Sequence, residues 1–216
     1  MASSKQQLNR QMTLVFRRTG QRRYAVEVQR PGLPDLEMNP APGYDPLMPH
    51  DMMHLVVEAQ LGLTRGIFGQ LASGGTAGTF HLSVNRDQSS RQITRSRKRV
   101  TARGKNLLKD GRDECEQSER ATFICWSEWR ARSSSREQRQ QAEIMAQQAK
   151  AIRNMTSAAE SRTLNQRKLD EICKHLDHLS ARWSTLEIGE SMAVAWPDLA
   201  IVVDSAYLSA SSAPRR

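Results

Sequence analysis

The chain has 216 residues and a net charge of +9, with 38% hydrophobic but only 5% aromatic residues. Its mean hydropathy of -0.64 is low for a compact enzyme, so we expect one folded domain with solvated extensions. No stretch approaches the ~18 apolar residues of a membrane span, and the N-terminus lacks an apolar signal segment. We therefore expect a cytoplasmic protein with no membrane partner.

The three cysteines are Cys115, Cys125 and Cys173. Their number is odd and their spacing is wide, so they show neither the paired pattern of a zinc ribbon nor a disulfide framework. A reducing compartment is the consistent interpretation.

The first predicted element is an antiparallel hairpin. Its strands are expected at 13–16 and 24–28, on either side of a turn at Gly20, and the second alternates Tyr24, Val26 and Val28 with smaller or polar residues. Prolines at 31, 34, 40, 42 and 46 then predict an extended connector without regular structure.

A helix is predicted over 49–61, because Pro49 suits a first helical residue and Gly62 an exit. On a helical wheel, His50, His54, Glu58 and Asp51 share a sector of about 100°, and apolar residues cover most of the rest. The following segment, TRGIFGQLASGG, predicts a short helix packed closely against a neighbour.

Residues 83–105 are polar and strongly basic, which predicts a loop. A helix is expected over 112–132, with Trp126 and Trp129 facing the core. The longest helical pattern, 136–183, loses its apolar register at 156–168, so we expect a break there. We also expect 136–168 to protrude, and helix 136–183 to offer a surface for a protein partner or for self-association.

The C-terminal segment predicts a second hairpin, with strands at 186–188 and 191–196 and a turn at Gly189 and Glu190. We expect the two hairpins to share one antiparallel sheet, packed with helices and accompanied by a long helix or helical hairpin, in an α+β fold. We expect a single domain that comprises 12–82 and 106–203, with a flexible arm at 1–11 and a disordered tail at 204–216.

The histidine helix carries the most specific chemistry. His50 and His54, one turn apart, can chelate one divalent metal such as Zn²⁺, with Glu58 as third ligand, Asp51 as outer partner or base, and His81 as a distant alternative. HDMMH has the outline of the protease motif HExxH, but the shorter Asp51 stands where the glutamate belongs. Two structural alternatives stay open: a solvated face, or a buried hydrogen-bond network centred on His54.

Other enzyme classes find little support. Ser73 and Ser83 lack the elbow motif of serine hydrolases, and no cysteine lies in a basic motif that would activate it. The glycines between 66 and 78 are not followed by the Gly-Lys-Ser/Thr of a phosphate loop. Whether the protein is an enzyme is left open by the sequence.

The alternative function is binding of nucleic acid or another polyanion. Residues 1–30 hold seven basic residues against one acidic residue, and residues 86–105 hold eight against one. Such segments neutralise phosphates, although no aromatic stacking pattern accompanies them. The candidate contacts are Arg91, Arg95, Arg97, Lys98, Arg99 and Arg103.

Two motifs, PHDMMHLVVE at 49–58 and RWSTLEIGESMAVAWP at 182–197, carry a resemblance. They resemble an uncharacterised family of small bacterial proteins that pair a Pro-His-Asp-x-x-His-x-x-Val-Glu helix with a C-terminal Trp/Gly/Trp-Pro hairpin. The resemblance covers about a third of the chain. It implies a bacterial, cytoplasmic protein and transfers no mechanism.

Overall fold

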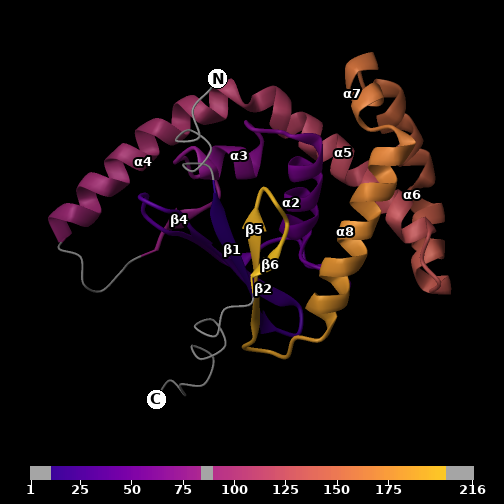
Figure 1. Ribbon diagram of the computed structural model, residues 1–216, viewed down its shortest axis with the longest axis horizontal. Helices are drawn as coiled ribbons and strands as arrows, with labels where there is room; N and C mark the ends of the chain where they lie inside the picture. Colours follow the sequence, from indigo (N-terminus) through magenta and orange to yellow (C-terminus); the bar gives the residue numbers. More distant parts are fainter. Residues whose placement is uncertain (1–10, 84–89, 203–216) are drawn as a thin grey trace.

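The computed structural model describes residues 11–83 and 90–202, without the side chains of 90–93, 96 and 97. In this part of the chain, strands form one six-stranded antiparallel sheet and helices arch over it (Figure 1). The fold is therefore α+β, as the sequence predicted. The arm and the tail predicted from the sequence lie outside the described residues, apart from residue 11.

The sheet joins the two ends of the chain. Its strand order is β4-β3-β2-β1-β5-β6, and β1 pairs with β2 on one side and with β5 on the other. The prediction that N- and C-terminal strands share a sheet is confirmed. The strands are β1 Met12–Gly20, β2 Arg23–Gln29, β3 Leu36–Ala41, β4 His81–Leu82, β5 Ser191–Trp196 and β6 Ile201–Val202.

Two strand predictions were wrong. The C-terminal hairpin consists of β5 and β6, joined by a turn in which the Ala195 amide donates to the Ala200 carbonyl. Residues 186–188 are not a strand, because they follow the end of a helix directly, and Ile188 is 58% exposed. The proline-rich connector contains β3, whose Leu36 and Met38 alternate inward. Pro40 is tolerated because it falls where the register between β2 and β3 shifts.

The helices match the predicted pattern in most places. A helix near 49–61, a short helix after it, a helix near 112–132 and a break within 136–183 are all confirmed. At the break, Ser157 and Glu160 form a reciprocal capping box that starts a new helix. The helices are α2 His50–Leu61, α3 Ile67–Ala72, α4 Ser90–Asp110, α5 Arg112–Ala131, α6 Arg136–Met155, α7 Ala158–Thr163 and α8 Gln166–Ser184.

The prediction of a loop over 83–105 was wrong, because α4 occupies most of that range. Arginine, lysine, alanine and leucine favour helices, and Val100, 7% exposed, anchors the segment to the domain. Residues 84–89 lie outside the described part. The segment 136–168 was predicted to protrude; its first helix, α6, packs along α5, where Ala142 and Ala149 are buried.

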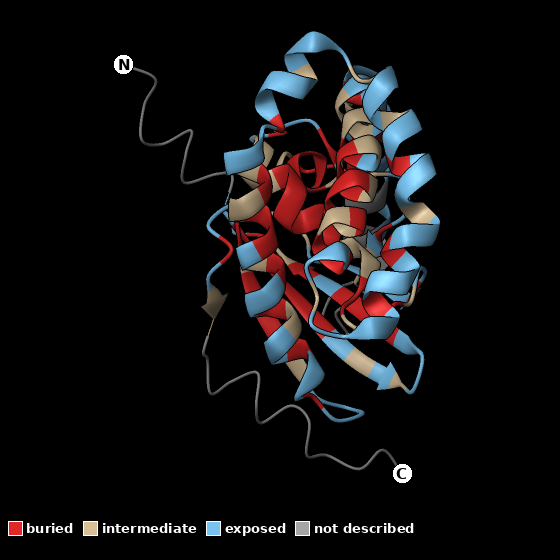
Figure 2. Ribbon diagram, turned by 90° about the vertical axis from the view of Figure 1, so that its right-hand side faces the viewer, coloured by how far each residue is buried: buried red, intermediate tan, exposed pale blue. Residues whose placement is uncertain are grey.

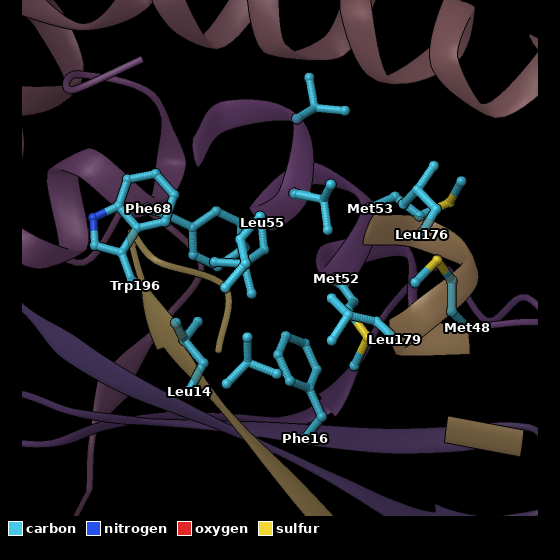
Figure 3. Close-up of a cluster of buried hydrophobic side chains, with 14 of the residues drawn as sticks. Leu14, Phe16, Met48, Met52, Met53, Leu55, Phe68, Leu176, Leu179 and Trp196 are labelled. Carbon is cyan, nitrogen blue, oxygen red and sulfur yellow. The ribbon is translucent and has the colours of Figure 1, made fainter. Parts of the chain in front are cut away.

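Helix α2 lies at the centre of the molecule. It packs against α3, α5 and α8, and the ribbon is buried there while the outer helices are exposed (Figure 2). Phe16 of β1, Met52 and Leu55 of α2, and Leu179 of α8 meet in the core (Figure 3). A helix surrounded on nearly every side must place any polar residue against another element.

None of the described helices combines the length and the apolarity that crossing a membrane requires.

Candidate metal centre

The polar sector of α2 faces α5, and His54 stands at its middle. This imidazole is 2% exposed. Its Nδ1 lies 2.9 Å from the Ser118 hydroxyl oxygen and 3.2 Å from that of Thr122, both on α5. The sequence hypothesis of a pre-organised sector centred on His54 agrees with this arrangement.

The other ring nitrogen of His54 points toward two further metal-ligand groups. His54 Nε2 lies 3.1 Å from His50 Nε2 and 3.6 Å from the Glu119 carboxylate. The two imidazole planes meet at 82°. Donor atoms of His50, His54 and Glu119 all lie within 4.8 Å of one another, so the three residues could hold a metal ion.

These separations suit a small transition-metal ion. Zinc binds imidazole nitrogen at about 2.0–2.1 Å, and tetrahedral ligands at that distance lie about 3.3 Å apart. The Nε2–Nε2 distance of 3.1 Å is close to this value. The Glu119 side chain is 65% exposed and His50 is half-buried, so the open side of the cluster faces solvent.

Glu58, the third ligand expected from the sequence, makes different contacts. Its Oε1 accepts hydrogen bonds from the Ile67 amide at 2.9 Å and the Ser118 hydroxyl at 2.8 Å, and its Oε2 accepts from the Phe68 amide at 2.9 Å. The carboxylate thus caps the first turn of α3, where backbone amides have no partner within the helix. The carboxylate that joins the two histidines in the metal-capable group is Glu119.

Gly66 makes this cap sterically feasible. A Cβ atom at position 66 would lie 2.6 Å from the Glu58 carboxylate, closer than side chains can approach. Only glycine leaves room for the carboxylate to reach both amides.

Ser118 connects the cap to the histidines. When Glu58 is ionised, the Ser118 hydroxyl donates its proton to the carboxylate, and the Ser118 oxygen is left to accept a hydrogen bond from His54 Nδ1. In that state of Glu58, the network favours the His54 tautomer with the proton on Nδ1. Nε2 then carries the free lone pair that a metal needs, as in carboxylate–histidine–metal arrangements.

Burial shifts both titrating groups toward their neutral forms. It raises the pKa of Glu58 to about 7, in spite of the three hydrogen bonds that favour the carboxylate. It lowers the pKa of His54 to about 3, with a smaller contribution from His50. A neutral His54 is the form that binds metals.

Asp51 is not part of the metal-capable group. Its carboxylate is hydrogen-bonded to the Tyr24 hydroxyl, which also lies 2.5 Å from the Pro42 carbonyl oxygen. Burial raises the pKa of Asp51. These contacts connect α2 to β2. They also occupy the carboxylate that would have to act as the general base if HDMMH worked like the protease motif HExxH.

The remaining sequence candidates lie elsewhere. His81 belongs to β4, at one edge of the sheet, and is exposed. Arg95, Lys98, Arg99 and Arg103 are exposed on α4. Arg91 and Arg97 also belong to α4, but their side chains lie outside the described residues.

Trp126 of α5 stands beside the cluster. Its ring centroid lies 6.3 Å from that of His50, with the planes at 60°, and the Arg130 guanidinium lies 4.9 Å from the same ring. Arg130 is paired with Asp45 and is 2% exposed. Trp126, which the sequence predicted to face the core, therefore also packs against one side of the His50 ring.

Ser118 and Glu119 were missed by the sequence analysis. Ser118 extends the inward stripe of α5 by one turn, since it precedes Thr122 by four residues, and Glu119 lies beside it at the exposed edge of that stripe. The available signal in the sequence was the presence of polar residues next to the apolar stripe of α5. Pairing them with His50 and His54 required the packing of α5 on α2.

Comparisons with family models, with curated proteins and with solved structures find no match for this chain.

Proposed function

We propose that the protein binds a divalent transition metal of the zinc type through His50, His54 and Glu119. The observation that carries this proposal is the convergence of two imidazole Nε2 atoms, 3.1 Å apart, with a carboxylate within the same 4.8 Å. Imidazole and carboxylate together suit Zn²⁺ and its neighbours in the first transition row.

The contacts around the three ligands also support a metal site. Ser118, which is itself hydrogen-bonded to Glu58, contacts His54 Nδ1 and so leaves Nε2 facing His50, and Trp126 packs against His50. Ligands whose orientation is fixed before binding lose less entropy when the metal arrives. Three protein ligands beside solvent leave a coordination position for water or a small ligand, as in zinc sites that are not purely structural.

The test is a titration of zinc into metal-free protein, prepared without a histidine tag and monitored by calorimetry. We expect the parent to bind about one equivalent, and His54→Ala to lose at least about 100-fold in affinity, because both the ligand and its network disappear. Glu119→Gln keeps the size of the side chain but removes its charge, so it should weaken binding by about 10- to 100-fold.

His178→Ala is the matched control, because His178 is an exposed histidine on α8 away from the cluster. It should bind zinc like the parent. If the two ring nitrogens share only a hydrogen bond, the parent takes up no stoichiometric zinc. That result, or equal binding by the parent and His54→Ala, would overturn the proposal.

A further inference from the structure

Helix α4 carries a concentrated positive charge that the fold leaves unneutralised. Over 90–109 the sequence contains no aspartate or glutamate. Among described residues, the ion pairs involve arginines and lysines of other segments and none from α4. The described basic side chains of α4 are all exposed: Arg95, Lys98, Arg99, Arg103, Lys105 and Lys109.

These six residues occupy one face. At 100° per residue they fall within a sector of about 160°. Val100, Gly104 and Leu107 lie opposite, where Val100 and Gly104 are buried. A Cβ atom at Gly75 would lie 2.9 Å from Leu107, which shows how closely this side of α4 packs on the segment after α3.

The packing decides which surface is free. The apolar side of α4 is occupied by its own domain, apart from Leu108, which is 40% exposed. An interfacial membrane helix needs that side for insertion into lipid. What α4 offers to a partner is therefore mainly positive charge, along a helix of 21 residues, or about 30 Å.

We infer that the exposed face of α4 binds the phosphate backbone of double-stranded nucleic acid without reading its sequence. The rod is nearly as long as one turn of B-form duplex, about 34 Å. Arginine and lysine are the residues that contact phosphates. The described face has no aromatic side chain on which unpaired bases would stack, which favours a duplex over a single strand.

The experiment measures binding of the full-length protein to a fluorescent duplex of about 20 base pairs by anisotropy, over a range of salt concentrations. The test variant combines Arg95→Gln, Lys98→Gln and Arg99→Gln. The control combines Arg112→Gln, Arg162→Gln and Arg167→Gln, which removes the same net charge from exposed positions on α5, α7 and α8.

The parent should bind with an affinity that falls as salt rises. Loss of three phosphate contacts should make the salt slope shallower by about 2.7 and weaken binding by at least about tenfold at 0.1 M salt. The control should keep the slope of the parent within about one unit. A second, unrelated duplex should bind equally well.

Several outcomes would overturn the inference. Equal weakening in both triple variants would mean that only the net charge matters. Tighter binding to a single strand of the same length would assign the face to unpaired nucleic acid. Binding to phosphatidylserine vesicles but not to the duplex would assign it to a lipid surface. Both triple variants change only exposed side chains, so they should stay folded. A circular dichroism melt of each variant checks this before the binding results are compared.

Discussion

The α2–α5 interface and the outer face of α4 treat polar residues in opposite ways. Between α2 and α5, His54, Glu58 and Ser118 are buried, and each is hydrogen-bonded to another protein group. On α4, the described cations are exposed and none is paired with a carboxylate. The buried hydrogen bonds between α2 and α5 contribute to the stability of the fold. The exposed cations of α4 change that stability little, and their positive charge stays available to attract an external partner.

The largest expected effect comes from breaking the buried region at Glu58. Glu58→Ala leaves the amides of Ile67 and Phe68 and the Ser118 hydroxyl without their acceptor. We expect the free energy of unfolding to fall by about 3–5 kcal/mol, because three buried donors lose their common acceptor. Urea unfolding monitored by circular dichroism measures this. A loss below about 1 kcal/mol would show that water replaces the carboxylate readily.

The second effect is a pH dependence. Because the folded pKa of Glu58, about 7, lies above the ordinary value of 4.5, the folded state binds this proton more tightly than the unfolded state. The stability so gained is fully present below pH 4.5 and is lost as pH rises through 7, by an amount on the order of 3 kcal/mol. His54, with a lowered pKa, contributes stability that is lost as pH falls from 6.5 toward 3.

These two contributions oppose each other between pH 4.5 and 6.5, so the parent should show a flattened profile. Glu58→Gln removes one of them. The parent should therefore lose stability relative to Glu58→Gln as pH rises from 4.5 to 7, when urea unfolding is measured at half-unit steps. A difference between the two proteins that stays constant over this range would contradict the assignment of Glu58 as the titrating group.

The smallest effect is expected on α4. The variant with Arg95, Lys98 and Arg99 changed to glutamine should unfold within about 0.5 kcal/mol of the parent, because these side chains are exposed and unpaired. The same urea titration tests it. A loss of more than about 1 kcal/mol would mean that the cations have partners within the protein, and the contrast between the two regions would disappear.

Much of this arrangement could be predicted because it is local. Gly62 ends α2 as expected, whereas Pro49 precedes the helix as its N-cap instead of being its first residue. The i, i+4 spacing brings His50 and His54 together in any helix. Glu58 shares their sector on a helical wheel. Its carboxylate is nevertheless committed to the first amides of α3, and a wheel does not show that need.

What could not be predicted depends on contacts between distant segments. Glu119 joins the histidines only because α5 crosses α2 at that turn. Helix α4 was mistaken for a loop because it has few apolar residues. Its packing through Leu107 and Leu108 depends on Gly75 and Gly78, which belong to the segment after α3. β3 was missed because prolines usually interrupt strands, yet this strand lies near the edge of the sheet.

The position of β1 has a consequence for how the chain folds. Met12 pairs with Trp196, so this strand finds one of its neighbours about 180 residues further along the chain, a separation that slows folding more than it weakens the final state. During synthesis, β1 and β2 can form their hairpin early. The other edge of β1 then stays open, with its amides and carbonyls available to other chains, until β5 leaves the ribosome. Chains that stop before residue 191 would keep that edge and should self-associate.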